Sequence, residues 1–185
     1  MSGLDAFARG VKAHAAYADT RSVSSPLPER AAQALARETS VPGLVQATCR
    51  AVVELLDASA CTLSRVIGDL LVDLVEYPRR GVAHGHGYLI ADYPLTQEVL
   101  EQKEPRTVSL LDDDPEPNEA RLLEEFGFAS LLMLPLQIEG HCWGLVEVYA
   151  GGSRRFVDAD AALAERVVAH AGELLEELER GAAAA

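Results

Sequence analysis

Two pairs of strand-like runs, each joined at a glycine, constrain the fold of this chain more than any other feature. One pair spans Ala60 to Tyr77 and turns at Gly68-Asp69, and the other spans Ser130 to Ala150 and turns at Glu139-Gly140. Apolar and β-branched residues are frequent in both pairs, and glycine supplies the positive φ that tight hairpin turns require. The sequence therefore predicts two β-hairpins that lie far apart along the chain.

Helical patterns flank and separate these hairpins. A cap signal at Thr39-Ser40 precedes an amphipathic run from Val41 to Leu56, and a final helix with two adjacent apolar stripes follows from about Asp158. This order predicts an α+β fold with a central antiparallel sheet of about five to six strands. We expect the terminal helices on one face of the sheet and a helical and loop cover over a pocket on the other. The second apolar stripe of the final helix favours packing against another subunit.

The segment from Tyr88 to Pro105 is the expected cover. It begins as an extended stretch, turns at Pro94 and then holds only about three helical turns before the second proline. A helix this short is marginal by itself in water, so it needs support from the rest of the fold. The segment is therefore predicted to pack over one face of the sheet and to be the element that moves when a ligand enters.

The charge and hydropathy of the chain argue against nucleic-acid-binding and membrane proteins. The formal net charge is −13 and the pI is about 4.7, which disfavours binding to nucleic acid and to anionic membranes. No apolar run approaches the roughly 20 residues that span a bilayer, and the N-terminus lacks the pattern of a signal peptide. A cytoplasmic protein is expected. We divide the chain into an N-terminal helical extension and linker (1–40, with a helix from Leu4 to Ala18), a main domain (41–180) and a disordered tail (181–185).

Three segments of the main domain resemble the GAF domain, a small-molecule sensory module of signalling proteins. They are Phe128-Ala-Ser-Leu-Leu-Met-Leu-Pro-Leu136, Glu139-Gly-His-Cys-Trp-Gly-Leu-Val-Glu-Val-Tyr149, and Arg155-Phe156 with Asp158-Ala-Asp160. Their order and spacing carry the resemblance, which covers about Val41 to Arg180. It implies a pocket on the face of the sheet opposite the terminal helices, roofed by the segment between the hairpins. Transferred to this sequence, the resemblance makes Tyr88, Asp92, Tyr93 and Thr96 the candidate ligand-binding residues, although Asp92 or Thr96 could instead cap the short helix.

Cysteine chemistry is the main alternative. GAF domains that hold a bilin covalently use a cysteine usually followed by histidine, whereas Cys49, Cys61 and Cys142 precede Arg, Thr and Trp. The free methionine sulfoxide reductases of the family carry cysteines around the pocket, and the interval from Thr62 to His141 has none, although Cys61 and Cys142 could meet across the sheet. The signature of cyclic-nucleotide-binding members is not evident. No catalytic residue is therefore assigned.

Two weaker patterns suggest metal ions. His84 and His86 would share one side of an extended segment, with Asp92 as a third donor, and the acidic run from Asp112 to Asp114 could attract calcium. Both lack a complete ligand set, so solvated loops explain them better and no metal is assigned.

These observations lead to a non-enzymatic sensory or regulatory domain that binds an unknown small organic ligand and forms a homodimer through its terminal helices. A signalling protein is a possible partner, and no cofactor is assigned. The alternatives are a protein-interaction scaffold whose pocket is filled by side chains, and a thiol-based free methionine sulfoxide reductase.

Overall fold

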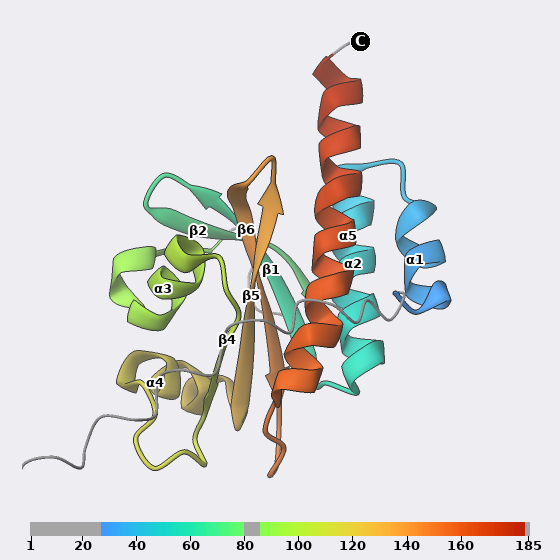
Figure 1. Cartoon of the computed structure of the whole chain (residues 1–185). Coiled ribbons are helices and arrows are strands. Elements are labelled where there is room, and N and C mark those ends of the chain that lie inside the picture. The colour runs from blue at the N-terminus through green and yellow to red at the C-terminus, as the bar shows by residue number, and fades with distance from the viewer. Residues whose placement is uncertain (1–26, 80–85, 184–185) are drawn as a thin grey trace, which may run out of the picture.

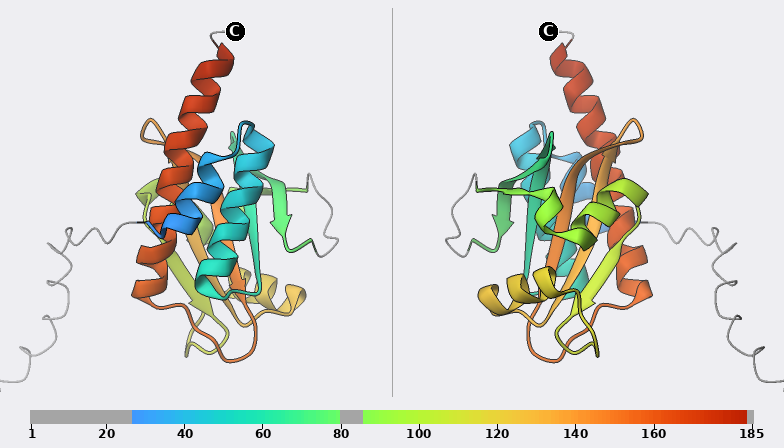
Figure 2. Two further views of the ribbon diagram at one scale, coloured as in Figure 1. Left: turned by 90° about the vertical axis from the view of Figure 1, so that its right-hand side faces the viewer. Right: turned by 90° about the vertical axis from the view of Figure 1, so that its left-hand side faces the viewer.

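The computed structural model describes residues 27–79 and 86–183, and in them a six-stranded antiparallel sheet lies between two layers of helices (Figure 1). In chain order the elements are α1 (Glu29–Ala36), α2 (Val41–Leu56), β1 (Ala60–Ile67), β2 (Leu70–Tyr77), β3 (Gly87–Leu89), the 3-10 turn η1 (Ile90–Asp92), α3 (Pro94–Gln102), β4 (Arg106–Ser109), α4 (Pro117–Phe126), β5 (Ser130–Ile138), β6 (His141–Ala150) and α5 (Asp158–Ala183). Helices α1, α2 and α5 cover one face of the sheet, and α3 and α4 lie on the other (Figure 2). The predicted α+β fold is confirmed.

The two predicted hairpins form the centre of the sheet. The strand order is β3-β2-β1-β6-β5-β4, so the hairpin β1–β2 lies beside the hairpin β5–β6. Gly68 and Gly140 turn the two hairpins with φ of 59° and 76°, a region that glycine enters without the steric cost a side chain would bring. The central pair β1–β6 joins segments from opposite ends of the domain, which makes the fold depend on long-range pairing.

The layer of terminal helices buries the larger core. Helix α2 begins where the sequence predicts, because the Ser40 hydroxyl accepts a hydrogen bond from the Gly43 N–H at 3.3 Å. Helix α5 packs on β5 and also on α2 and α1, so both of its apolar stripes find partners within one chain. A second subunit is therefore not needed to explain the second stripe. Fully buried members of this core include Leu44, Val52, Leu134, Val146 and Leu175.

A glycine in β6 allows the two hairpins to approach each other. A Cβ built on Gly144 would lie 2.3 Å from the backbone oxygen of Ser64 on β1, far inside van der Waals contact. Gly144 lies in the segment Glu139 to Tyr149 that resembles the GAF domain. Its role here is steric, since β1 and β6 could not pair closely with a larger residue at this point.

The cover face, by which we mean the face carrying α3 and α4, has its own smaller core. Its buried members include Val99 of α3, Val108 of β4, Leu123 of α4, Leu131 of β5 and Leu145 of β6. Helix α3 packs directly on β5. The short helix is therefore supported by the sheet, as the sequence predicts, but it lies beside the cavity described below and not over it.

The ends of the described chain differ from the predicted domain boundaries. Helix α1 falls in the predicted extension 1–40, yet Ala31 and Leu35 are buried in the core of the main domain. Helix α5 continues to Ala183, into the predicted disordered tail. The predicted helix from Leu4 to Ala18 lies outside the described residues.

Among the residues that the structure describes, no helix is both long enough and apolar enough to cross a membrane.

Candidate functional site

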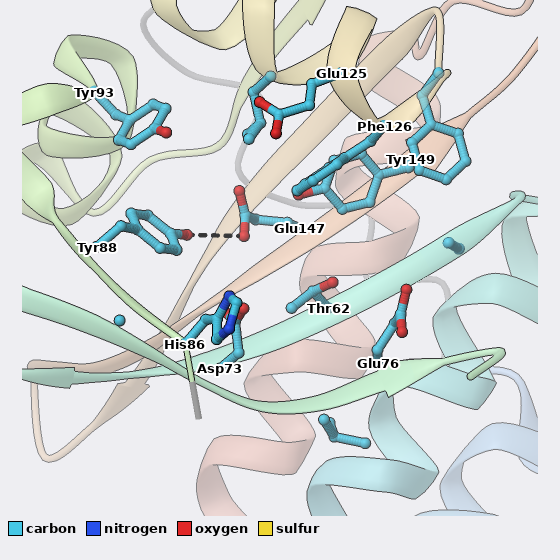
Figure 3. Close-up of a pocket in the computed structure, with 15 residues that line it drawn as sticks. Thr62, Asp73, Glu76, His86, Tyr88, Tyr93, Glu125, Phe126, Glu147 and Tyr149 are labelled. Carbon is cyan, nitrogen blue, oxygen red and sulfur yellow. Dashed lines mark hydrogen bonds between the residues drawn. The ribbon is translucent and has the colours of Figure 1, made fainter. Parts of the chain in front are cut away.

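A cavity of about 620 Å³ opens on the cover face of the sheet, between the strands β1, β2 and β6 and the segments that lie over them. Tyr88 on β3 and Tyr93 after η1 form one side, and Phe126 of α4 forms another (Figure 3). This volume is in the range of small-molecule sites. The cavity thus lies on the face that the sequence predicts, opposite the terminal helices.

Aromatic rings make up much of its wall. The rings of Tyr88 and Tyr93 meet edge to face with centroids 5.2 Å apart, and Phe128 stacks on Tyr149 at 5.0 Å. Phe126 also meets Tyr149 edge to face, at 6.3 Å. Such contacts hold rings in fixed orientations and are worth about 0.5–1.5 kcal/mol each beyond the area they bury. The cavity therefore has a preformed apolar wall.

The polar groups of the cavity are mainly acidic. Four carboxyl groups line it, those of Asp73, Glu76, Glu125 and Glu147. His86 is the one basic side chain among the fifteen described residues of the lining, which contain neither lysine nor arginine. The wall thus combines aromatic surface with negative charge.

Glu147 is the most unusual of these residues, because it lies in the middle of the sheet and is only 3% exposed. Strand β6 alternates, so Leu145, Glu147 and Tyr149 face the cavity side while Val146 and Val148 face the terminal helices. The Tyr88 hydroxyl donates a hydrogen bond to Glu147 Oε2 at 3.1 Å (Figure 3). A carboxyl group in this position needs polar partners, since burying it alone costs several kcal/mol.

Burial sets the ionisation of this group. Loss of solvent and the neighbouring Asp73 carboxylate raise the pKa of Glu147 to about 7, against hydrogen bonds from Tyr88 and Tyr149 that lower it. Burial and the charges of Glu147 and Asp73 raise the pKa of Tyr88 well above its ordinary value, so its hydroxyl stays protonated and can donate. Of these two residues, only Glu147 therefore gains or loses a proton near neutral pH.

Asp73 approaches the cavity from β2. It accepts a hydrogen bond from the Ser64 hydroxyl at 2.7 Å, and Ser64 is buried on the neighbouring strand β1. This bond helps to orient the Asp73 side chain. Asp73 and Glu147 thus place two carboxyl groups on one concave surface.

The four predicted site residues separate into two groups. Tyr88 and Tyr93 line the cavity. Asp92 is exposed in η1 and is not part of the lining, while Thr96 is 2% exposed and its hydroxyl donates to Met133 Sδ at 3.5 Å. The prediction placed all four in the wall because it assumed that the short helix covers the pocket, whereas α3 lies on β5.

The sequence interpretation missed Glu147, Asp73 and Tyr149. A signal for Glu147 was available: it is the one charged residue in the run from Trp143 to Ala150, at a position where alternation puts it on the cover face. Asp73 similarly interrupts the apolar run of β2. An isolated carboxylate in a core strand is a rare and informative observation.

Glu119 of α4 supports the cover. Its carboxylate oxygen Oε1 accepts from the backbone N–H groups of Leu95 at 3.0 Å and Thr96 at 3.1 Å, and so caps α3 from another helix. Glu119 is fully buried, and burial together with a hydrogen bond to Glu116 raises its pKa to about 7, against the backbone N–H donors. This contact holds α3 and α4 together at the edge of the cavity.

The cysteines lie away from this site. Cys49 and Cys61 are buried together in the core under the terminal helices, and the Cys142 thiol donates to the Leu100 carbonyl at 3.2 Å. The suggested meeting of Cys61 and Cys142 is wrong: Cys61 pairs with Val148, six residues along β6, which is about 20 Å away at strand spacing.

The weaker metal patterns gain no support. His84 lies outside the described residues, and His86 is exposed at the cavity mouth. Asp112 accepts from the Ser109 N–H at 3.0 Å and pairs with Arg155 at 2.8 Å, so it stabilises its own loop. No group of three His, Cys, Asp or Glu side chains within 27–79 and 86–183 has the arrangement of a metal site.

Solved phytochrome domains share this fold. The chromophore-binding domain of Stigmatella aurantiaca phytochrome P1 matches with a TM-score of 0.65 at 16% sequence identity, over 81% of this chain and 57% of that one. The chromophore-binding domain of an unusual bacteriophytochrome from R. palustris matches with a TM-score of 0.68 at 11% identity, over 83% and 61%. The chain thus spans less than two thirds of either solved chain. A search of curated proteins finds no match.

The sequence itself shows the family. The family model for the GAF domain matches residues 41–175, which is most of the chain and includes both hairpins, the cover and the greater part of α5. This confirms the resemblance drawn from the strand and helix motifs. With an antiparallel sheet between two helical layers, the chain belongs to the GAF domain family.

Proposed function

We propose that this protein is a non-catalytic sensory domain that binds a small organic molecule in the cavity lined by Tyr88, Tyr93 and Glu147. One observation carries the proposal: a cavity of about 620 Å³ combines a wall of fixed aromatic rings with a buried, hydrogen-bonded carboxyl group at its centre. Apolar walls with a few placed polar groups are typical of ligand sites. An open cavity also favours ligand binding over a scaffold whose pocket is filled by side chains.

The positions of the thiols favour a sensory role over catalysis. None of the three cysteines belongs to the described lining, and Cys61 lies in the opposite core from the cavity. Burial also raises the pKa values of Cys61 and Cys142, which disfavours the reactive thiolate. A reductase that forms and resolves a sulfenic acid, or a covalent chromophore, finds no support in this arrangement.

Native mass spectrometry of the protein purified from its own source tests ligand binding. We expect a retained mass that is lost in Thr62→Trp, because Thr62 lines the cavity on β1 and an indole would fill it. Thr107→Trp is the matched control, since Thr107 is exposed on the edge strand β4. A retained mass that survives Thr62→Trp would place the ligand elsewhere, and no retained mass in the wild type together with no binding of added compounds would reject the proposal.

A contact between β6 and α5 offers a route from the cavity to the terminal helices. The Trp143 indole donates to Glu179 Oε1 at 2.7 Å, and the Arg65 guanidinium lies 4.2 Å above the indole ring. A ligand that prefers one position of β6 would shift the packing of α5 by its differential affinity. Hydrogen exchange of α5 with and without ligand tests this, with loss of the response expected in Trp143→Phe.

Homodimerisation through α5 belongs to the same proposal. The C-terminal end of α5 extends beyond the sheet (Figure 1), and Leu174 and Leu178, which pack on the core of their own chain, are only partly buried. Sedimentation equilibrium should report a dimer in the wild type and a monomer in the double variant Leu174→Arg with Leu178→Arg. The exposed substitution Glu177→Gln is the control on the same helix. A monomeric wild type would end this part of the proposal and leave ligand binding untouched.

A further inference from the structure

The charge of the cavity restricts what it can bind. Its four carboxyl groups come from three separate elements: Asp73 and Glu76 from β2, Glu125 from α4 and Glu147 from β6. The lining residues that the structure describes include neither lysine nor arginine. A carboxylate or phosphate ligand would meet like charge in a partly desolvated space, where such repulsion is stronger than in water. An anionic ligand is therefore disfavoured.

Glu147 gives this negative surface a centre. It is 3% exposed and points from the middle of the sheet into the cavity (Figure 3). The charged side chains Asp73 and Glu119, which act on its pKa, are both acidic, and its hydrogen bonds come from the neutral phenols of Tyr88 and Tyr149. An ionised carboxylate in such a place costs free energy unless a cation joins it. The cavity supplies room for that cation.

The aromatic wall fits the same kind of ligand. Tyr88, Tyr93, Phe126 and Tyr149 surround the space in front of Glu147, and their relative orientations are fixed by ring contacts. The face of an aromatic ring carries negative charge density and attracts organic cations. The buried carboxyl group and the aromatic wall thus both favour an organic cation. The carboxyl group alone would also suit a metal ion, and the rings alone would also suit a neutral apolar molecule.

From this arrangement we infer that the ligand is a small organic cation, a protonated amine on an apolar body, whose ammonium group pairs with Glu147. The inference rests on the proposed function and specifies the chemistry of the same site. The ammonium group would donate to the Glu147 carboxylate while the apolar body lies against the aromatic rings. The phenol of Tyr88 would hold the carboxylate in place from the other side.

Three probes that share an indole ring separate the charge from the shape of the ligand. Tryptamine is the cation, indole-3-propionate the anion and tryptophol the neutral compound. Titration calorimetry at pH 8, where Glu147 is mainly ionised, should show tryptamine binding about tenfold or more tightly than indole-3-propionate, a difference of at least about 1.4 kcal/mol. Thr62→Trp should abolish the binding of tryptamine, and Thr107→Trp should leave it unchanged.

The variant Glu147→Gln tests the counter-ion directly. It keeps the size of the side chain and an oxygen for the Tyr88 hydroxyl, but removes the charge. We expect tryptamine binding to weaken about tenfold or more while tryptophol binding changes less than about twofold. The exposed control Glu177→Gln should alter neither. A folded Glu147→Gln that binds tryptamine as the wild type does overturns the inference.

The outcomes also separate this inference from the proposed function. If indole-3-propionate or tryptophol binds more tightly than tryptamine and Thr62→Trp blocks it, the cavity is a ligand site and the cationic ligand is wrong. If none of the three binds at millimolar concentration, the cationic inference falls. The proposed function falls with it only if native mass spectrometry also finds no retained molecule.

Discussion

The hydroxyl of Tyr88 donates to Glu147 Oε2 across 3.1 Å and so connects the edge strand β3 to the central strand β6. These strands are not neighbours, because β2 and β1 lie between them in the sheet. The contact is possible because the sheet curls and brings its edge over the cavity. One hydrogen bond therefore closes one side of the site and fixes the carboxyl group at its centre.

Tyr88→Phe tests the contribution of this bond to stability. At pH 8 the acceptor is mainly ionised, and removing a donor from a buried charged group should lower the free energy of unfolding by about 1.5–3 kcal/mol. The loss should be smaller at pH 5, where Glu147 is protonated. Urea denaturation at both pH values measures it. Tyr77→Phe is the control, because the phenylalanine keeps the ring contact with Arg50; equal losses for the two variants would contradict the assigned role.

Gly144→Ala tests whether close approach of β1 and β6 requires glycine. The new Cβ would lie 2.3 Å from the Ser64 backbone oxygen, and both strands are central, so neither can move away easily. We expect a loss of about 1–3 kcal/mol in thermal or urea unfolding. Gly181→Ala is the matched control in open space on α5, where alanine should stabilise the helix by up to about 1 kcal/mol. A neutral Gly144→Ala would show that the strands can separate.

Local sequence patterns predicted most of the fold because the elements follow strong local rules. The hairpins were readable from apolar runs around Gly68 and Gly140, and the start of α2 from Ser40 as a cap. The position of α3 was not readable, because whether a short amphipathic helix lies over or beside a cavity depends on long-range packing. Glu119, which caps α3 from α4, shows the difficulty: it is 23 residues from Thr96 in the chain.

Only part of the site was predicted, again because long-range packing cannot be read from local sequence patterns. Tyr88 and Tyr93 lie in the expected cover and line the cavity, whereas Asp73, Glu147 and Tyr149 come from strands. The prediction looked for ligand contacts only in the cover segment. Alternation along β6 would have placed Glu147 on the cover face, but the pairing that sets its partners, Tyr88 and Asp73, appears only in three dimensions.

Glu119→Leu tests the support that α4 gives to α3. The leucine keeps the bulk of the side chain but leaves the N–H groups of Leu95 and Thr96 without their acceptor. Unsatisfied buried donors cost about 1–3 kcal/mol, so these two amides should exchange with deuterium faster, by roughly tenfold or more. Hydrogen exchange with mass spectrometry measures the change. The exposed Glu124→Leu on the same helix is the control, and unchanged exchange at α3 would mean that the cap contributes nothing.

The stability of the protein should depend on pH through Glu147. Its pKa rises from the ordinary 4.5 to about 7 on folding, so between these values the folded chain holds a proton that the unfolded chain has released. Its contribution to stability is therefore full below pH 4.5 and is lost as the pH rises to about 7, a total of about 3 kcal/mol.

The variant Glu147→Gln lacks this titrating group. Comparing it with the wild type therefore separates the contribution of Glu147 to the pH dependence from that of other groups. Urea denaturation from pH 5 to pH 8 should show a steeper fall in the free energy of unfolding for the wild type than for the variant. A residual slope should remain, because the pKa of Glu119 is also raised to about 7. Glu177→Gln on the exposed face of α5 should follow the wild type. Identical slopes for the wild type and Glu147→Gln would mean that the carboxyl group is solvated in the folded state. The inference of a cationic ligand would then lose its basis, because it depends on a buried Glu147 carboxylate.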